Sequence, residues 1–382
     1  MKETLLRIGS YLLVAVLATV LTLTMVHLQV GLKPTKLDQL EALIREKSIE
    51  NVDFAKLEDA AAEAMVNATD RWSYYIPASE YEAYREQSEN AYVGVGMTIQ
   101  ATEDGSGFLI VAVAPGGPAE EAGIQVKDLL IRVGETDIRS LTAEEVRNLV
   151  KGEEGTNVSL TVLRQGTPET IFVPRRRVET PVATYEMLDG NVGLVTIENF
   201  DERCAQESIQ AIETLLENGA QKLIFDVRHN PGGFASELVE LLDYLLPEGD
   251  LFRTVRYDGK EHVDTSDADC LEMPMAVLVN ASSYSAAEFF AAALREYEAA
   301  VIVGEETVGK GYFQSTYQLS DGSAVALSIG KYFTPNGISL AEAGLTPDVV
   351  VSVEEDIALE IYYGTLAARQ DPQIQAAIKA LN

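Results

Sequence analysis

The pattern of apolar and polar positions divides the chain into four stretches, of which the first is a continuous apolar run. Residues 8–32 contain no charged side chain over 25 positions, which is long enough to cross a bilayer as a helix. Lys2 and Arg7 precede the run, and flanking positive charge keeps that end in the cytoplasm. The pattern predicts a cytoplasmic N-terminus at residues 1–7, one transmembrane anchor at 8–32, and a remainder outside the cytoplasm.

A cleaved signal peptide is the alternative interpretation of this run. Such a signal has an apolar region of about 7–15 residues followed by a small-x-small cleavage site. The run here is longer, and residues 26–31 offer no such site. We therefore favour an uncleaved anchor.

In the second stretch, residues 33–90, apolar side chains recur at helical spacing. The repeating positions are Leu37, Leu40, Leu43, Ile44, Phe54, Leu57, Ala61, Ala64 and Met65. They predict an acidic N-terminal helical region whose helices each have a buried face. Two short helices cannot bury both faces alone, so we expect them to pack on the body of the protein or on a second copy. A plain spacer is the alternative.

The third stretch, residues 91–175, consists of short β-rich runs separated by glycine. A helix is expected at 142–150, and strands are expected at 97–100, 107–113, 129–133 and 158–164. This pattern predicts a small β domain, which ends in an Arg- and Pro-rich linker at 174–181.

In the fourth stretch, residues 176–353, strands alternate with helices. Strands are expected at 191–197, 222–227, 275–280 and 300–304, and helices at 202–218, 235–245 and 285–297. This alternation predicts an α/β fold with a mostly parallel sheet, which binds ligands outside the carboxyl ends of its strands. We also expect a hairpin of 315–319 and 324–331, turning at Asp321 and Gly322, and a helical tail at 354–382.

Composition and charge narrow the range of functions. With 382 residues, of which 47% are hydrophobic, the chain suits two or three domains with apolar cores. The 29 basic and 60 acidic residues give a net charge of -31. Because this charge repels nucleic acid, we expect no nucleic-acid partner.

The two cysteines, Cys204 and Cys270, form no CxxC motif and have no histidine neighbours. Neither a zinc site nor a dense disulfide scaffold is indicated. Two unpaired thiols are the favoured interpretation, and one disulfide is the alternative. No metal ion and no other cofactor is expected.

Three loops, 228–233, 281–284 and 305–310, leave the carboxyl ends of the expected strands and can meet in one crevice. The middle loop leads into helix 285–297 with a run of small residues. A hydroxyl at a helix N-terminus lies where an anion is favoured. Of the three candidates Ser282, Ser283 and Ser285, the last is nearest the helix start, and the other two are expected to cap or pack.

Acyl transfer also needs donors for the oxyanion and a base for the nucleophile. Ala286 follows Ser285 and presents a backbone N–H. Gly232 or Gly233 is the candidate for the second donor, because a glycine lets substrate approach the backbone. The sequence Asn-Pro-Gly-Gly is also an ordinary turn, so the choice stays open.

Lys310 lies between two glycines in the third loop and is a candidate base for a serine nucleophile. Its pKa must be lowered by burial or by a positive dipole. Tyr312 and Phe313 make a desolvated position plausible, and Gln314 is placed to hold the amine by a hydrogen bond. A surface lysine in a tight turn is one alternative. A Ser-His-Asp triad using His229 is another.

Residues 92–97 lead into the first strand of the β domain with two glycines. Backbone N–H groups of such a loop can converge on a peptide's terminal carboxylate, while the adjacent strand edge pairs with the peptide. Together with residues 118–124 and 127–135, the order of motifs resembles a PDZ domain. Its carboxylate-binding loop then falls on Gly94, Val95, Gly96 and Met97. A β-barrel of purely structural use is the alternative.

Residues 70–348, about three quarters of the chain, resemble a carboxy-terminal processing peptidase of the S41 serine peptidase family. Besides the PDZ motifs, the matching pieces are 72–77, 226–233, 283–288, 309–314, 332–337 and 344–348. The resemblance implies a crotonase/ClpP-like αβ protease core with an inserted PDZ domain. It also implies Ser285 as nucleophile, Lys310 as base, Gln314 as the supporting residue, and an N-terminal region that dimerises.

Three positions depart from the family pattern. Tyr284 replaces a usual small residue, Ala287 replaces a usual serine, and His229 occupies a variable position in the glycine loop. Tyr284 before the nucleophile bears on substrate preference rather than on the reaction.

The expectation is thus a membrane-anchored serine endopeptidase of the bacterial cell membrane, with its catalytic part outside the cytoplasm. Its PDZ domain is expected to recognise protein substrates with unstructured apolar C-termini, and the chain is expected to form a homodimer. A PDZ-based binding module and a non-proteolytic acyl hydrolase on a crotonase-like fold are the two rival functions.

Overall fold

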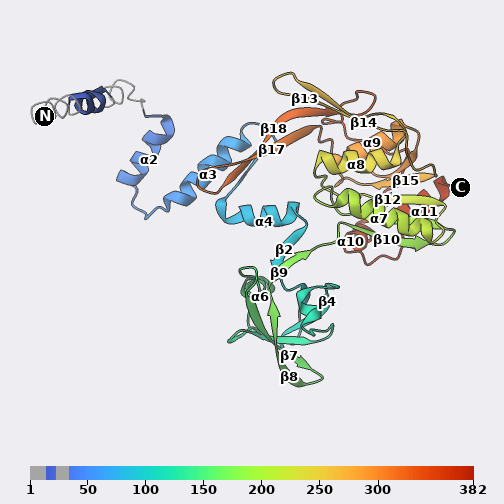
Figure 1. Ribbon diagram of the computed structural model, residues 1–382, viewed down its shortest axis with the longest axis horizontal. Helices are drawn as coiled ribbons and strands as arrows, with labels where there is room; N and C mark the ends of the chain where they lie inside the picture. Colours follow the sequence, from blue (N-terminus) through green and yellow to red (C-terminus); the bar gives the residue numbers. More distant parts are fainter. Residues whose placement is uncertain (1–13, 23–33) are drawn as a thin grey trace, which may run out of the picture. The chain divides into compact units, whose positions relative to one another are not determined.

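The computed structural model describes residues 14–22 and 34–382 (Figure 1), and these divide into two units with the boundary between residues 65 and 66. The first unit contains α2 (Lys36–Lys47) and most of α3 (Phe54–Asn67), so the expected helices are confirmed. Thr35 caps α2 through a capping box with Asp38. Neither α2 nor α3 contains a fully buried residue, so the expected buried faces have no complete cover within the described chain.

The predicted anchor falls mostly on residues 8–13 and 23–32, which lie outside the described residues. Residues 14–22 are helical. Within the described ranges, no helix combines the length and the apolar character that a bilayer crossing requires.

The second unit contains a small β domain, whose sheet has the order β3-β4-β5-β7-β8, with β6 beside β5. The strands are β3 (Met97–Ala101), β4 (Phe108–Val113), β5 (Leu129–Val133), β6 (Thr136–Asp137), β7 (Asn157–Arg164) and β8 (Thr167–Pro174). Alternate residues of β7 are buried, as expected of a strand with one face on a core. Two helices, α5 (Pro118–Glu121) and α6 (Ala143–Val150), complete the domain. The strands and the helix predicted here are confirmed, and β6 and β8 are additional.

A two-stranded ribbon joins this domain to the rest of the unit. β2 (Ala91–Gly94) pairs antiparallel with β9 (Arg176–Glu179). The chain therefore enters and leaves the β domain side by side, which is the topology of an inserted domain.

The α/β body is built on a six-stranded sheet of order β10-β11-β12-β15-β16-β19. All neighbours from β11 to β19 pair in parallel, and β10 is antiparallel at one edge. The strands are β10 (Ala183–Leu188), β11 (Val192–Ile197), β12 (Lys222–Asp226), β15 (Met275–Val279), β16 (Ala300–Gly304) and β19 (Val349–Val350). The predicted parallel sheet is confirmed.

Helices cover both faces of this sheet. α7 (Cys204–Glu217), α8 (Ala235–Leu245) and α9 (Ala286–Glu296) share a buried core with one set of alternating strand residues. The opposite face packs on α11 (Pro372–Ala380), with Ile374 and Ala377 buried there. α10 (Glu355–Tyr362) precedes α11. Because both faces are covered, the central strands are almost wholly apolar.

A second sheet of five strands flanks the body. Its members are β1 (Tyr74–Ile76), β13 (Gly249–Arg256), β14 (Glu261–Ser266), β17 (Tyr312–Gln318) and β18 (Ala324–Phe333). The predicted hairpin is confirmed as β17 and β18. The interpretation of 33–90 as wholly helical differs from the structure, because β1 pairs with β18. α4 (Ala78–Ser88) follows β1.

Candidate active site

Ser285 lies at the N-terminus of α9, just beyond the carboxyl end of β15. Its backbone has φ 59° and ψ -126°, a conformation that costs a non-glycine residue about 1–3 kcal/mol and clusters at functional sites. The residue is only 7% exposed. The candidate nucleophile is therefore held in a strained and largely buried turn.

The glycine loop contacts this turn directly. A Cβ atom on Gly232 would lie 2.7 Å from Ser285 Cβ and 2.8 Å from Ala286 N, and Gly232 has φ +85°. A Cβ on Gly233 would lie 2.2 Å from the carbonyl carbon of Phe200. Only glycine fits at either position. A side chain on residue 232 would push the loop away from Ser285, and a side chain on residue 233 would push it away from Phe200.

The hydrogen bonds of this loop separate the two glycines. Gly232 N–H donates to Asn230 Oδ1 at 2.8 Å. Within residues 34–382, neither Gly233 N–H nor Ala286 N–H has an intramolecular acceptor. These two N–H groups are therefore available to a ligand oxygen, whereas Gly232 N–H is already engaged.

Glu288 joins the serine and the lysine. This fully buried carboxylate accepts hydrogen bonds from Ser285 N–H at 2.9 Å, Gly309 N–H at 2.7 Å and Lys310 N–H at 2.9 Å, and from the Thr307 hydroxyl. One side chain thus fixes the backbone of both loops. This role was not predicted from the sequence, although an acidic residue in the first turn of a largely apolar helix was a visible signal.

The Lys310 side chain lies in an aromatic environment. Its Nζ is 5.4 Å from the centroid of the Trp72 ring and 5.5 Å from that of the Tyr284 ring. Burial lowers the pKa of Lys310 below its usual range, and Glu288 and Asp70 act in the opposite direction. In the described part of the chain, no hydrogen bond joins this amine to Ser285 or to Gln314.

Gln314 binds the backbone of Trp72 rather than the amine of Lys310. Its Nε2 donates to the backbone oxygen of Trp72 at 2.8 Å. The residue lies on β17, four positions beyond Lys310. Gln314 therefore anchors a neighbour of Lys310, which differs from the direct contact expected from the sequence.

The other two serines of this loop make local hydrogen bonds, one through its hydroxyl and one through its backbone. The buried Ser283 donates its hydroxyl to Val227 O at 2.7 Å, and Ser282 N–H donates to Asn280 Oδ1 at 3.0 Å. His229 pairs with Asn280 through Nε2 at 2.9 Å. Among the described residues, its imidazole has no hydrogen bond to a serine, which gives no support to a triad.

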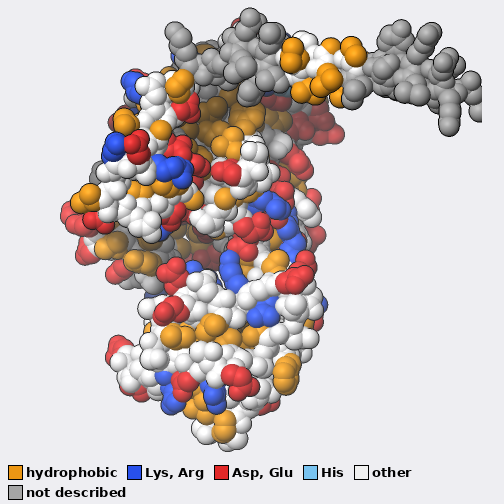
Figure 2. All heavy atoms as spheres, turned by 90° about the vertical axis from the view of Figure 1, so that its left-hand side faces the viewer, with side chains coloured by type: hydrophobic (Ala, Val, Ile, Leu, Met, Phe, Trp, Pro, Cys, Tyr) orange, Lys and Arg blue, Asp and Glu red, His pale blue; other side chains and the backbone are white. Residues whose placement is uncertain are grey.

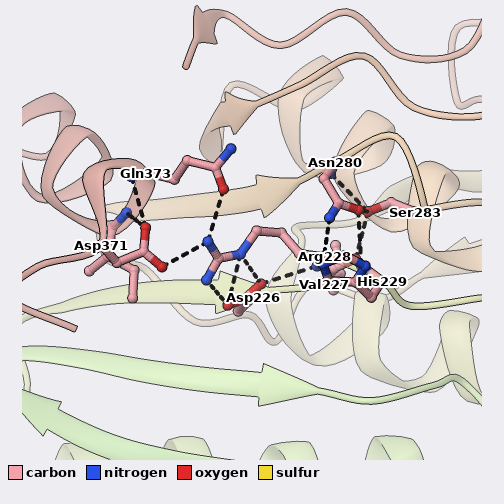
Figure 3. Close-up of polar contacts among 9 residues, drawn as sticks. Asp226, Val227, Arg228, His229, Asn280, Ser283, Asp371 and Gln373 are labelled. Atoms are coloured by element: carbon pink, nitrogen blue, oxygen red, sulfur yellow. Dashed lines mark hydrogen bonds and ion pairs between the residues drawn. The ribbon is translucent and has the colours of Figure 1, made fainter. Parts of the chain in front are cut away.

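An ion-pair network anchors the start of the glycine loop (Figure 3). The buried Arg228 contacts Asp226 of β12 and donates to Asp371 and Gln373, each at 2.8 Å. In Figure 3 its guanidinium points toward the start of α11, while Asn280 reaches His229 on the other side. The C-terminal helix is thereby tied to the loop that contacts Ser285.

Ser285, Lys310, Gly232 and Gly233 all line one cleft of about 830 Å³, which we call the serine cleft. Its wall includes several aromatic side chains: Tyr74, Tyr81, Tyr84, Phe234, Tyr284, Phe313 and Tyr332. Asp201 also lines it. Burial, with Glu202 and Glu237 nearby, raises the pKa of Asp201 to about 7.

A second cavity of about 460 Å³, here called the PDZ groove, lies beside residues 94–97. Within residues 34–382, Val95 N–H and Gly96 N–H have no intramolecular acceptor, so the predicted loop presents free donors. α6 contributes Arg147 and Val150 to the groove. Lys151 also lines it and forms a 2.6 Å ion pair with Glu86 of α4.

Both cysteines are free, as the favoured interpretation predicted.

On the face drawn in Figure 2, basic side chains occur in small groups among acidic ones, with apolar side chains between them. This arrangement agrees with the strongly acidic composition.

Comparison with known families supports the two-domain interpretation. Residues 191–351 match the model of peptidase family S41, and residues 109–164 match a PDZ domain model. Two curated relatives are named probable CtpA-like serine proteases. The one from Staphylococcus aureus strain COL is 29% identical over 369 residues, covering 94% of this chain and 74% of the relative. The one from Staphylococcus epidermidis is 29% identical over 365 residues, covering 93% and 74%.

Solved structures of similar fold include a putative S41 protease from Bacteroides fragilis. It has a TM-score of 0.53 and 19% identity, covering 87% of this chain and 92% of that one. A photosystem II D1 C-terminal processing protease has a TM-score of 0.47 and 27% identity, covering 83% and 87%. The fold expected from the sequence, an α/β protease body with a PDZ domain, is confirmed.

Proposed function

We propose that Ser285 and Lys310 form the catalytic pair of this serine peptidase, whose residues 191–351 match peptidase family S41 and whose residues 109–164 match a PDZ domain. In this mechanism the Ser285 hydroxyl attacks the scissile carbonyl while neutral Lys310 removes its proton. The N–H groups of Ala286 and Gly233 stabilise the oxyanion. The Lys310 ammonium then protonates the leaving amine, and an acyl ester remains on Ser285.

Deacylation uses the same groups in reverse. Lys310, again neutral, removes a proton from a water molecule that attacks the ester carbonyl. The tetrahedral intermediate uses the same two N–H donors. Its collapse expels the Ser285 oxygen, which takes the proton from Lys310, and releases the peptide with a new C-terminal carboxylate.

The shared Glu288 carboxylate is the observation that carries this proposal. It accepts hydrogen bonds from both Ser285 N–H and Lys310 N–H, so the nucleophile and the base are attached to one buried group. Because the Lys310 amine lies near two rings instead of at the hydroxyl, its flexible side chain must rotate for proton transfer. Because one carboxylate holds both backbones in place, the proposal requires movement of the Lys310 side chain and not of the loops.

The PDZ groove supports a substrate class. Free N–H groups at residues 94–97 beside apolar Val150 suit an unstructured peptide with an apolar C-terminal residue and a free carboxylate. We therefore propose cleavage near the C-termini of such proteins. We further propose that residues 8–32 anchor a homodimer in the bacterial membrane, with the catalytic part outside the cytoplasm.

The test is peptide cleavage by the full-length protein and by its Ser285→Ala and Lys310→Met variants. Both variants should lose cleavage, and the parent should cut a free-carboxylate peptide faster than its amidated form. Cleavage by Ser285→Ala at the parent rate would contradict the proposal. Peptide binding with no cleavage by the parent would favour a binding module, and turnover of esters alone would favour an acyl hydrolase.

A further inference from the structure

Two aromatic rings lie close to the amine of Lys310. The Trp72 and Tyr284 rings are stacked at an interplanar angle of 26°, with centroids 6.4 Å apart. Lys310 Nζ lies 5.4 Å and 5.5 Å from their centroids. Both distances are within the range of about 6 Å in which a ring face attracts an ammonium group.

Backbone hydrogen bonds hold the two residues that carry these rings. Trp72 N–H donates to Asp70 Oδ1 at 2.7 Å, and Trp72 O accepts from Gln314 at 2.8 Å. Tyr284 N–H donates to Asn230 O at 3.1 Å, and its ring lines the serine cleft. Because Tyr284 directly precedes Ser285, a ring that holds the lysine is attached to the turn that holds the nucleophile.

We propose that Tyr284 is a positioning residue for Lys310: with Trp72 it forms an aromatic clamp that holds the ammonium form in the serine cleft and sets the pH at which the amine becomes a base. This inference rests on the proposed function of Lys310. The clamp favours the charged amine because the ring faces are electron-rich. Proton loss weakens this attraction and frees the amine to reach Ser285.

Several charged groups act on the same amine. Burial lowers the pKa of Lys310, whereas Glu288 of α9 and Asp70 beside Trp72 raise it. The Arg71 guanidinium lies 4.2 Å from the Trp72 ring, and Asp201 acts on Tyr284 across the cleft. The clamp, like Glu288 and Asp70, favours the ammonium form of Lys310. Replacing a ring by an apolar group of similar size keeps the burial, so it should lower the pKa of Lys310.

Trp72 allows a direct measurement because it is the only tryptophan in the chain. Its emission responds to charge next to the indole ring. We would titrate the fluorescence of full-length Ser285→Ala from pH 6 to 11. A transition should appear for Lys310 and should be absent after Lys310→Met. Asp201→Asn in the same background removes the transition expected of Asp201, whose pKa is raised to about 7.

The ring variants test the clamp. In the Ser285→Ala background, Tyr284→Phe should leave the midpoint unchanged, because it keeps the ring face. Tyr284→Leu should move the midpoint about half a pH unit lower. In the active enzyme, the acidic limb of kcat/KM should shift in the same way. Tyr81→Leu is the matched control, since Tyr81 lines the same cleft but stacks on Tyr84, and its limb should stay in place.

Three results would overturn the clamp: a fluorescence transition of the Ser285→Ala, Asp201→Asn protein that Lys310→Met leaves unchanged, equal shifts for Tyr284→Phe and Tyr284→Leu, or no shift for Tyr284→Leu. The fluorescence titration is performed without an active nucleophile, so it does not depend on cleavage. Retained cleavage by Ser285→Ala would instead contradict the proposed function and leave the clamp measurement intact.

Discussion

The serine cleft and the PDZ groove present backbone N–H groups to a ligand in different ways. In the serine cleft, the buried side chains of Glu288 and Arg228 hold the loops, and Ser285 is strained. In the PDZ groove, a glycine turn presents the donors, and an ion pair between Lys151 and Glu86 at the groove is partly exposed. A site held by buried charges should fail when one is removed, whereas a site held by backbone shape should change gradually.

One helix borders both sites. α4 contributes Glu86 to the PDZ groove and Tyr84 to the serine cleft, and Gln87 lines both. Tyr84 also forms a 3.0 Å hydrogen bond with Thr316 of β17, the strand that carries Gln314. The two cavities therefore share a wall. Each variant must be tested both for cleavage in the serine cleft and for peptide binding in the PDZ groove.

The largest effect is expected from Glu288→Gln. Glutamine cannot accept all the N–H and hydroxyl bonds that the carboxylate accepts, so both catalytic loops lose their anchor. We expect kcat/KM to fall by at least about 100-fold and the free energy of unfolding to fall by about 3 kcal/mol. Peptide affinity of the PDZ groove should not change.

Glu298→Gln is the control for this variant, because Glu298 is exposed just beyond the same helix. Steady-state kinetics, urea unfolding and peptide binding make the comparison. If the Glu288→Gln enzyme were active and as stable as the parent, the serine cleft would not depend on a buried charge, and the contrast with the PDZ groove would be wrong.

Two glycine variants should separate the sites next. Gly232→Ala places a Cβ 2.7 Å from Ser285 Cβ, so we expect kcat to fall by about 100-fold. Gly96→Ala also meets a positive φ but only a 3.2 Å contact with Ala114 Cβ, so peptide affinity should fall by about 10-fold. Hydrolysis of a short ester, which does not need the groove, should be lost only in Gly232→Ala. Equal loss in both variants would contradict this division.

A smaller effect is expected from Asp201→Asn, and it depends on pH. The pKa of Asp201 is raised from 3.8 to about 7, so the fold favours the neutral acid. This contribution to stability is complete below pH 3.8 and is lost as pH rises through about 7. The variant should be about 1–2 kcal/mol more stable than the parent at pH 8.5, with the gap closing toward pH 4.

Thermal unfolding at several pH values measures this gap. Asp189→Asn, at an exposed aspartate, is the surface control and should change the free energy of unfolding by no more than about 0.5 kcal/mol. If the difference in stability between Asp201→Asn and the parent did not change with pH, it would not come from ionisation of the Asp201 carboxyl.

The smallest effect is expected from Glu86→Gln. The variant breaks an ion pair in which Lys151 is 39% exposed, and such pairs are worth about 0.2–1 kcal/mol. The freed Lys151 can attract a peptide carboxylate, so affinity should rise two- to fivefold. Calorimetry with free and amidated peptides checks this expectation, and weaker binding of the free peptide would contradict it.

The sequence predicted those parts of the fold that depend on local patterns. The alternation of strands and helices, the start of α9 and the order of the three loops are all visible in the printed sequence. β1 and the β13–β14 hairpin were not predicted. β1 has three residues and depends on a partner strand more than 200 positions away, which a local pattern cannot report.

Side-chain networks were the second gap. The contact of Arg228 with Asp371 spans 143 positions, and the contact of Gln314 with Trp72 spans 242. The choice between Gly232 and Gly233 depended on one hydrogen bond to Asn230. Such pairings follow from the packed structure and not from residue spacing. The sequence therefore predicted the candidate reacting groups more completely than the residues that hold them in place.

The most direct test of the account is the rate at which an activated ester acylates Ser285, followed by intact mass and peptide mapping across pH. We expect one acyl group on Ser285, with a rate that rises with pH through a single ionisation below 10.5, the ordinary pKa of lysine. Lys310→Met should acylate at least about 100-fold more slowly at pH 8. Acylation of another residue, or an unchanged rate in Lys310→Met, would contradict the assignment of Ser285 and Lys310 as the catalytic pair.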